Sequence, residues 1–156
     1  MGQQQLLLLV LGIVIVGLAV VVGIQAFGEN SRKANADALV NDGVRIASDA
    51  QAWKLKPAAF GGGADQGDWT GLTLAQLGYT QEVGATTAAT DVAYYDNLNG
   101  QWVIDNAGAT FVIKGCNAQN NNEVTVTVRG TTSQDIETSI DTASNCEQAA
   151  PPPAAG

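Results

Sequence analysis

Two cysteines are the residues of this chain whose types and spacing point most directly to chemistry. Cys116 and Cys146 are the only cysteines, and they do not form a Cys-x-x-Cys pair, so we expect neither a redox role nor a cysteine-rich zinc site. A structural disulfide between them would close a loop of about thirty residues and contribute roughly 3.5 kcal/mol in the chain-entropy treatment. The pair therefore predicts a domain that folds outside the reducing cytoplasm.

The rest of the reactive inventory argues against an enzyme. The chain has no histidine, which removes the commonest general base, the commonest metal ligand and any Ser-His-Asp triad. The glycines at positions 61–63 are not followed by Gly-Lys-Ser/Thr, so they do not form a phosphate-binding P-loop. We expect a protein without catalytic residues and without a cofactor.

Acidic residues are abundant but do not form a metal-binding motif. Asp65, Asp68 and Glu82 lack the spacing of an EF-hand loop, so solvated charge is preferred to a calcium site. The same interpretation applies to Asp96, Asp105 and Glu123. A formal charge of −8 disfavours direct binding to nucleic acids or to anionic lipid surfaces.

The chain begins with an apolar N-terminal segment, residues 1–27. Residues 6–24 contain no charged or polar side chain, and three glutamines precede them. A run of this length spans a bilayer as a helix. Gly12, Gly17 and Gly23 lack the Gly-x-x-x-Gly spacing, which leaves open whether they mark close helix packing or ordinary tolerance of glycine.

The charges that flank the apolar segment conflict with the expected disulfide. Arg32 and Lys33 follow the segment, and the positive-inside rule would place the later domain in the cytoplasm. The cysteines and the polar composition favour the outside. A basic leader that is removed before Met1 would resolve this conflict.

Residues 28–56 are expected to continue the helix as an amphipathic half. At 100° per residue, a set of apolar and small residues falls on one stripe, and Pro57 ends the pattern. We expect this stripe to pack on a sheet, through Leu39, Val40, Gly43, Ile46, Ala47, Ala50 and Trp53. Three tryptophans are expected as core anchors: Trp53, Trp69 and Trp102.

The remaining sequence predicts a small antiparallel sheet. Residues 57–90 form a Gly-rich connection, residues 91–150 hold about four strands and the disulfide-closed C-terminal region, and residues 151–156 form a Pro-rich tail. Ile136 and Ile140 are expected to dock one helical turn. The predicted fold class is therefore α+β, with a long N-terminal helix packed on the sheet.

This arrangement resembles that of bacterial type IV pilins. The resemblance rests most strongly on residues 6–32, where an apolar helix runs into an amphipathic half. It implies that the apolar segment forms a filament core and that a prepilin peptidase cleaves before Met1. Two positions depart from the family, because Gln5 stands where members usually have glutamate and Val22 stands where many have proline. Glutamine accepts a hydrogen bond from a neighbour's terminal amine but does not cancel its charge.

The resemblance implies a structural subunit that polymerises with copies of itself. It would be stored in the inner membrane, handled by inner-membrane assembly machinery, and delivered to an extracellular filament that serves adhesion, motility or DNA uptake. The expected filament-core residues are Met1, Gln5, Leu6, Leu7, Leu8, Leu9, Val10, Leu11, Ile13, Val14, Ile15, Val16, Leu18, Val20, Val21, Val22, Ile24 and Phe27. Two alternatives stay open: a type II secretion pseudopilin, and a single-pass anchored extracytoplasmic binding domain that does not polymerise.

Overall fold

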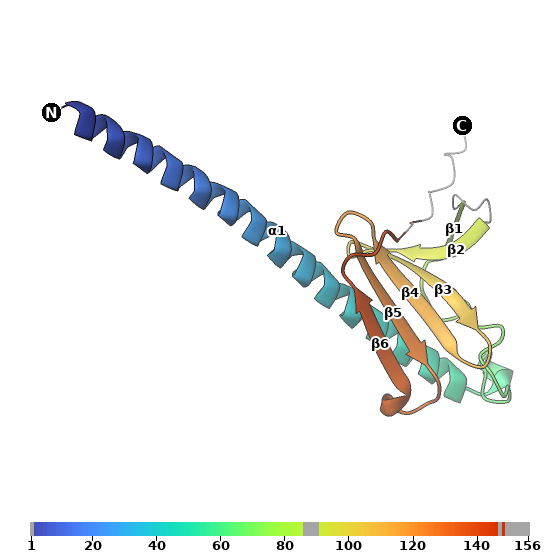
Figure 1. The fold of residues 1–156 in the computed structure, drawn as a ribbon. Helices are drawn as coiled ribbons and strands as arrows, with labels where there is room; N and C mark the ends of the chain where they lie inside the picture. The colour runs from blue at the N-terminus through green and yellow to red at the C-terminus, as the bar shows by residue number, and fades with distance from the viewer. Residues whose placement is uncertain (1, 86–90, 147, 149–156) are drawn as a thin grey trace, which may run out of the picture. The chain divides into compact units, whose positions relative to one another are not determined.

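A computed structural model of the protein describes residues 2–85, 91–146 and 148. The described residues form an α+β protein with one long helix and a six-stranded antiparallel sheet (Figure 1). The elements are α1 (Gly2–Leu55), the 3-10 turn η1 (Ala58–Phe60), β1 (Glu82–Ala85), β2 (Asp91–Asp96), β3 (Gln101–Ala107), β4 (Phe111–Asn117), β5 (Asn122–Val128), the 3-10 turn η2 (Ser133–Asp135) and β6 (Ile136–Asp141). Contacts divide the chain into two compact units, Met1–Ala34 and Asn35–Gly156, and each has its own architecture.

The first unit holds the N-terminal part of α1. Residues 2–34 contain no proline, and their leucines, alanines and glutamines are good helix formers. By length and composition the helix is apolar enough to cross a membrane, and none of its most apolar stretch is buried. An ideal Cβ on Gly12, Gly17 or Gly23 meets nothing within 4 Å, so these glycines face open space.

The second unit begins with the amphipathic part of α1. Its buried residues repeat every three or four positions, which is the period of one helix face. They are Ala36, Leu39, Gly43, Ile46, Ala47, Ala50 and Trp53. Val40 is half-buried against the same core. The helix stops at Leu55 because Pro57 has no N–H to donate and disfavours helix in the residue before it.

The sheet of the second unit is a meander in which each strand pairs antiparallel with the next, in the order β1-β2-β3-β4-β5-β6. Strand β5 alternates buried and half-buried residues, with Val124, Val126 and Val128 facing the core. The C-terminal turns of α1 cover one face of this sheet (Figure 1). The expectation of about four strands is therefore corrected to six.

The two additional strands arise where other structure was expected. Residues 136–141 form strand β6 beside β5, not the helical turn expected at Ile136 and Ile140. A spacing of four places two side chains on one side of either a helix or a strand, so that pair does not distinguish the two. Strand β1 lies within the segment expected as a connection and pairs with β2.

Trp102 is the centre of the helix-to-sheet core. Its side chain is fully buried, and glycines of two elements face its indole ring. An ideal Cβ on Gly43 of α1 would lie 2.9 Å from Trp102 Cη2, and one on Gly115 of β4 would lie 2.5 Å from the same atom. Both positions therefore need glycine, because a larger residue would overlap the ring.

The segment between α1 and β1 covers one end of this core. Trp69, Leu72 and Leu74 are buried, and the Trp69 N–H donates to the Gly108 carbonyl at 2.8 Å. The Lys54 ammonium donates to the carbonyls of Gln66 and Asp68 and lies 5.6 Å from the Trp69 ring centroid. The last turn of α1 thus anchors a connection that has little regular structure.

Cys116 of β4 and Cys146 form a disulfide with a sequence separation of 30 residues. It fastens the segment after β6 to the central part of the sheet. The same segment is held by Ser144, whose hydroxyl donates to Glu123 at 2.7 Å, and by Gln148, whose amide donates to the Cys116 carbonyl at 2.9 Å.

Loss of this disulfide is expected to lower the free energy of unfolding by about 3.5 kcal/mol, because the unfolded chain regains the entropy of a long loop. The measurement is chemical denaturation of the Cys116→Ser/Cys146→Ser variant against the oxidised wild type. Reductant should lower the wild-type midpoint towards that of the variant. An unchanged midpoint in both cases would contradict the expectation.

Candidate functional site

Most of the exposed large apolar side chains of the described residues lie on α1 in the first unit. The expected filament-core residues from Leu6 to Phe27 are all exposed, and Phe27 retains 79% of its accessible surface. Gln5 is exposed as well, whereas Met1 lies outside the described residues. Contiguous exposed apolar surface is costly in water, so cover by lipid or protein would lower its free energy.

The apolar part of α1 carries no charged side chain that could orient a binding partner. Every charged side chain of the protein lies at Glu29 or later, so the helix before it offers only shape, apolar area and the carboxamides of three glutamines. Between apolar helices, association depends on packing and on hydrogen bonds that satisfy polar groups. Gln3, Gln4 and Gln5 are the only residues in 2–24 with side chains capable of such hydrogen bonds.

A second feature is a network of amides around Asp42, within the second unit. One carboxylate oxygen of Asp42 accepts hydrogen bonds from the side-chain amides of Asn97 at 3.0 Å and Asn99 at 2.7 Å. The Asn35 side-chain amide donates to the Asn99 carbonyl at 2.9 Å, and the Asn122 amide donates to Asn35 Oδ1 at 2.9 Å. The network joins α1 to the β2–β3 turn and to β5.

This network was not anticipated from the sequence. Asn97 and Asn99 lie in the turn between β2 and β3. Asp42 is not among the residues predicted for the buried stripe of α1, and its partners are more than fifty residues away in the chain. A sequence pattern within one helix or strand cannot predict such a distant hydrogen bond. Asparagines near turns give no such signal either, because asparagine is common in turns for local reasons.

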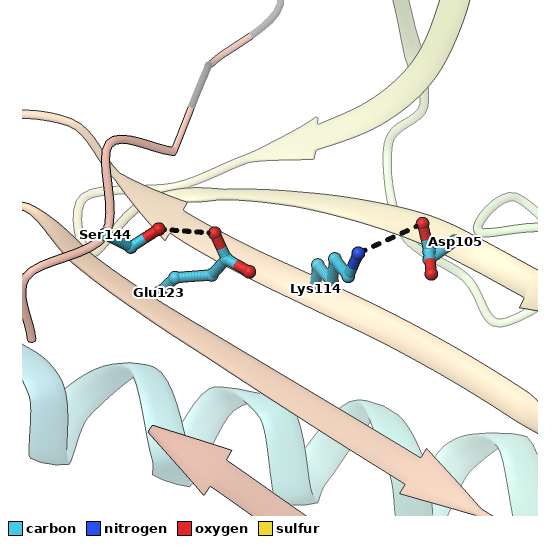
Figure 2. A network of polar contacts seen from close by, with 4 residues as sticks. All are labelled: Asp105, Lys114, Glu123 and Ser144. Carbon is cyan, nitrogen blue, oxygen red and sulfur yellow. Dashed lines mark hydrogen bonds and ion pairs between the residues drawn. The ribbon is translucent and has the colours of Figure 1, made fainter. Parts of the chain in front are cut away.

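The acidic residues of the outer sheet surface have individual partners (Figure 2). Lys114 Nζ lies 3.3 Å from Asp105 Oδ1, and the Ser144 hydroxyl reaches Glu123. Both members of the ion pair are about half exposed, so the pair contributes at most about 1 kcal/mol. Asp68 Oδ1 accepts the Thr70 N–H at 3.1 Å, and this hydrogen bond lowers the pKa of Asp68.

The described residues contain no group of three or more acidic, cysteine or histidine side chains placed to hold a metal ion. Glu82, which the sequence analysis considered with Asp65 and Asp68, instead accepts the Tyr94 hydroxyl at 3.0 Å. The Cys116 and Cys146 sulfurs are joined to each other.

Two tyrosines are expected to make the stability of the second unit depend on pH in the alkaline range. Burial, followed by hydrogen bonding to Glu82, raises the pKa of Tyr94 above its ordinary value of 10.0. Burial, followed by the 2.5 Å hydrogen bond to Asp49, likewise raises the pKa of Tyr79 above that value. In both cases the folded state favours the neutral phenol.

The stability that these tyrosines contribute is therefore expected to be fully present below pH 10.0, where they are protonated in both the folded and the unfolded state. It should be lost as the pH rises beyond that value. The unfolded state then loses its phenolic protons while the folded state still holds them. Thermal unfolding midpoints measured across this range test the prediction. The Tyr79→Phe/Tyr94→Phe variant should show a flatter profile, and an equally steep one would contradict the assignment.

Comparison of the chain with protein-family models, with curated proteins and with solved structures gives no match. What the structure establishes is a long apolar N-terminal helix, its amphipathic continuation packed on an antiparallel sheet, and a disulfide that closes the C-terminal region. The resemblance to type IV pilins thus rests on the chain's own residues and architecture.

Proposed function

We propose that this protein is a structural subunit that polymerises through residues 1–27 into an extracellular, type IV pilus-like filament. In this proposal the apolar helix is held in the inner membrane before assembly. It then leaves the lipid and packs against the same helix of neighbouring subunits, while the acidic sheet domain faces solvent. The protein acts by assembly and carries out no reaction.

The observation that carries the proposal is that the large apolar side chains from Leu6 to Phe27 are all exposed, while the second unit has its own core. The core of the second unit is made by residues from Ala36 onward. The apolar segment is therefore not needed to fill that core, and its surface remains for a partner. At roughly 25 cal/mol per Å², covering a helix of this kind is worth tens of kcal/mol in water.

The same apolar surface would let the helix move between the membrane and the filament at little cost, whereas its transfer into water would be costly. Moving an apolar helix from lipid into a helix bundle changes little apolar hydration, so the specificity must come from side-chain packing. Moving it from either environment into water restores the full hydrophobic cost. A filament built in this way needs no covalent linkage between subunits.

The charge distribution is compatible with this arrangement. The formal charge of −8 lies wholly outside residues 2–28, so a polymer would have an uncharged core and an acidic exterior. Acidic exteriors keep filaments apart and soluble, and at 0.1 M ionic strength salt screens the repulsion between exposed charges that lie more than about 10 Å apart.

Electron microscopy of material sheared from cells that make the protein tests the proposal. We expect filaments that bind an antibody raised against the sheet domain, with the chain identified in them by mass spectrometry. The N-terminal peptide should begin at Met1 and carry N-methylation, as the resemblance implies. A chain found only in the membrane fraction, with no filaments, would identify an anchored domain and overturn the proposal.

A further inference from the structure

The turn between β2 and β3 contains the only Asn-Gly pair in the sequence, Asn99-Gly100. Asparagine followed by glycine is the dipeptide most prone to deamidation, because glycine leaves its own backbone nitrogen unshielded. The question is whether this turn allows the reaction. Its contacts are those of the amide network around Asp42, and they do not depend on filament assembly.

Gly100 is not replaceable at this position. It is buried, and an ideal Cβ there would lie 2.5 Å from the Cys116 carbonyl oxygen and 3.0 Å from Leu39 Cδ2. Backbone atoms cannot move aside easily, so any side chain would push the turn away from β4. Packing therefore forces the chain to keep glycine directly after Asn99, and with it the reactive pair.

Both atoms that must react are held by hydrogen bonds. The Gly100 N–H, whose nitrogen is the nucleophile, donates to Asn97 Oδ1 at 3.0 Å. The Asn99 side-chain amide, whose nitrogen is the leaving group, donates to Asp42 Oδ2 at 2.7 Å. The backbone carbonyl of Asn99 accepts from Asn35 at 2.9 Å and from Asn117 at 2.7 Å. These contacts fix the peptide and the side chain, and both must rotate for the nitrogen to approach Cγ.

We propose that Asn99 is a latent deamidation site which Asp42 and Asn97 keep unreactive in the folded protein. The reaction begins when the Gly100 backbone nitrogen loses its proton and attacks Asn99 Cγ. A carbon–nitrogen bond forms, the bond from Cγ to Nδ2 breaks, ammonia leaves, and a five-membered succinimide results. Water then opens either carbonyl of the ring to give aspartate or isoaspartate. The net change is uptake of water and release of ammonia, with no oxidant or reductant.

The reaction would also remove the contact that restrains it. A carboxylate at position 99 would stand beside the Asp42 carboxylate, where an amide now donates a hydrogen bond. Two like charges at that distance repel, and the turn would lose one of its three hydrogen bonds to α1, keeping those of Asn97 and Asn35. Isoaspartate would in addition insert a carbon into the backbone of a turn that has no spare room at Gly100.

The test compares Asp42→Ala with Asp37→Ala. Each variant removes one carboxylate from α1 within the second unit, but Asp37 is exposed and makes none of these contacts. The full-length proteins are incubated at mildly alkaline pH, below their unfolding temperatures. Deamidation of the peptide containing Asn99 is followed by mass spectrometry and by isoaspartate detection.

Asp42→Ala is expected to deamidate at Asn99 about tenfold faster or more than wild type, the factor that corresponds to losing a hydrogen bond to a charged group. Asp37→Ala should match wild type, and Asp42→Asn, which keeps a carbonyl acceptor, should lie between. Wild-type protein unfolded in urea sets the unprotected rate, so the test holds even if Asp42→Ala is partly unfolded. Equal rates in folded and unfolded wild type, or in the two alanine variants, would overturn the proposal.

Discussion

Val14→Asp is expected to abolish filament formation while the sheet domain stays folded. Val14 lies near the middle of the apolar stretch, where its side chain is exposed in the single chain. A carboxylate at the centre of a membrane helix costs about 3 kcal/mol, and in a filament every subunit would bring the same cost to the core. The apolar helix offers the new charge no cationic partner, since the first basic residue is Arg32.

Val14→Leu is the matched control, because it keeps the position apolar and changes its volume only slightly. Filaments should form with this variant as with wild type. Folding of the sheet domain is followed by tryptophan fluorescence, which reports on this domain alone because Trp53, Trp69 and Trp102 are all buried in it. Normal filaments from Val14→Asp would mean that the apolar helix does not form the contact surface.

Trp102→Ala is expected to destabilise the sheet domain by about 3–5 kcal/mol, which is a large part of the stability of an ordinary domain. The ring is fully buried between Gly43 of α1 and Gly115 of β4. Neither glycine has a side chain that can move into the vacated space, so the cavity should persist. Denaturant unfolding followed by circular dichroism measures the loss.

Two comparisons make this prediction specific to the cavity. Leu98→Ala removes a fully exposed apolar side chain from the β2–β3 turn and should change stability by less than about 0.5 kcal/mol. Trp102→Ala/Gly115→Val should regain part of the lost stability, because a β-branched side chain suits a strand and would enter the empty volume. A second substitution that adds further destabilisation would show that the indole ring does not fill the space facing Gly115.

The buried faces that follow the period of a helix or a strand could be predicted from the sequence. The stripe on residues 36–53 repeats with the helical period, and the structure buries it on the sheet. Strand β5 alternates valine and threonine, which predicts a strand with one buried face, and the structure has this pattern. In each case a single element contains the whole signal, because the side chains that share a face are neighbours in sequence.

The features that depend on contacts distant in sequence could not be predicted. Strand β6 needs the open edge of β5 to pair with, and the Ile136 and Ile140 spacing suits a helix equally well. The role of Asp42 depends on a turn that follows it by more than fifty residues. Composition predicted the apolar helix, and the structure has it, but the periodicity of one chain does not encode what would cover its surface.

A cryo-electron microscopy reconstruction of isolated filaments would show whether residues 1–27 form the core of the polymer. We expect a helical assembly in which the apolar helices pack together at the axis and the sheet domains form the outer layer, with Phe27 and its apolar neighbours excluded from solvent. Filaments that are built from contacts between sheet domains, with the apolar helices absent from the axis, would contradict this expectation.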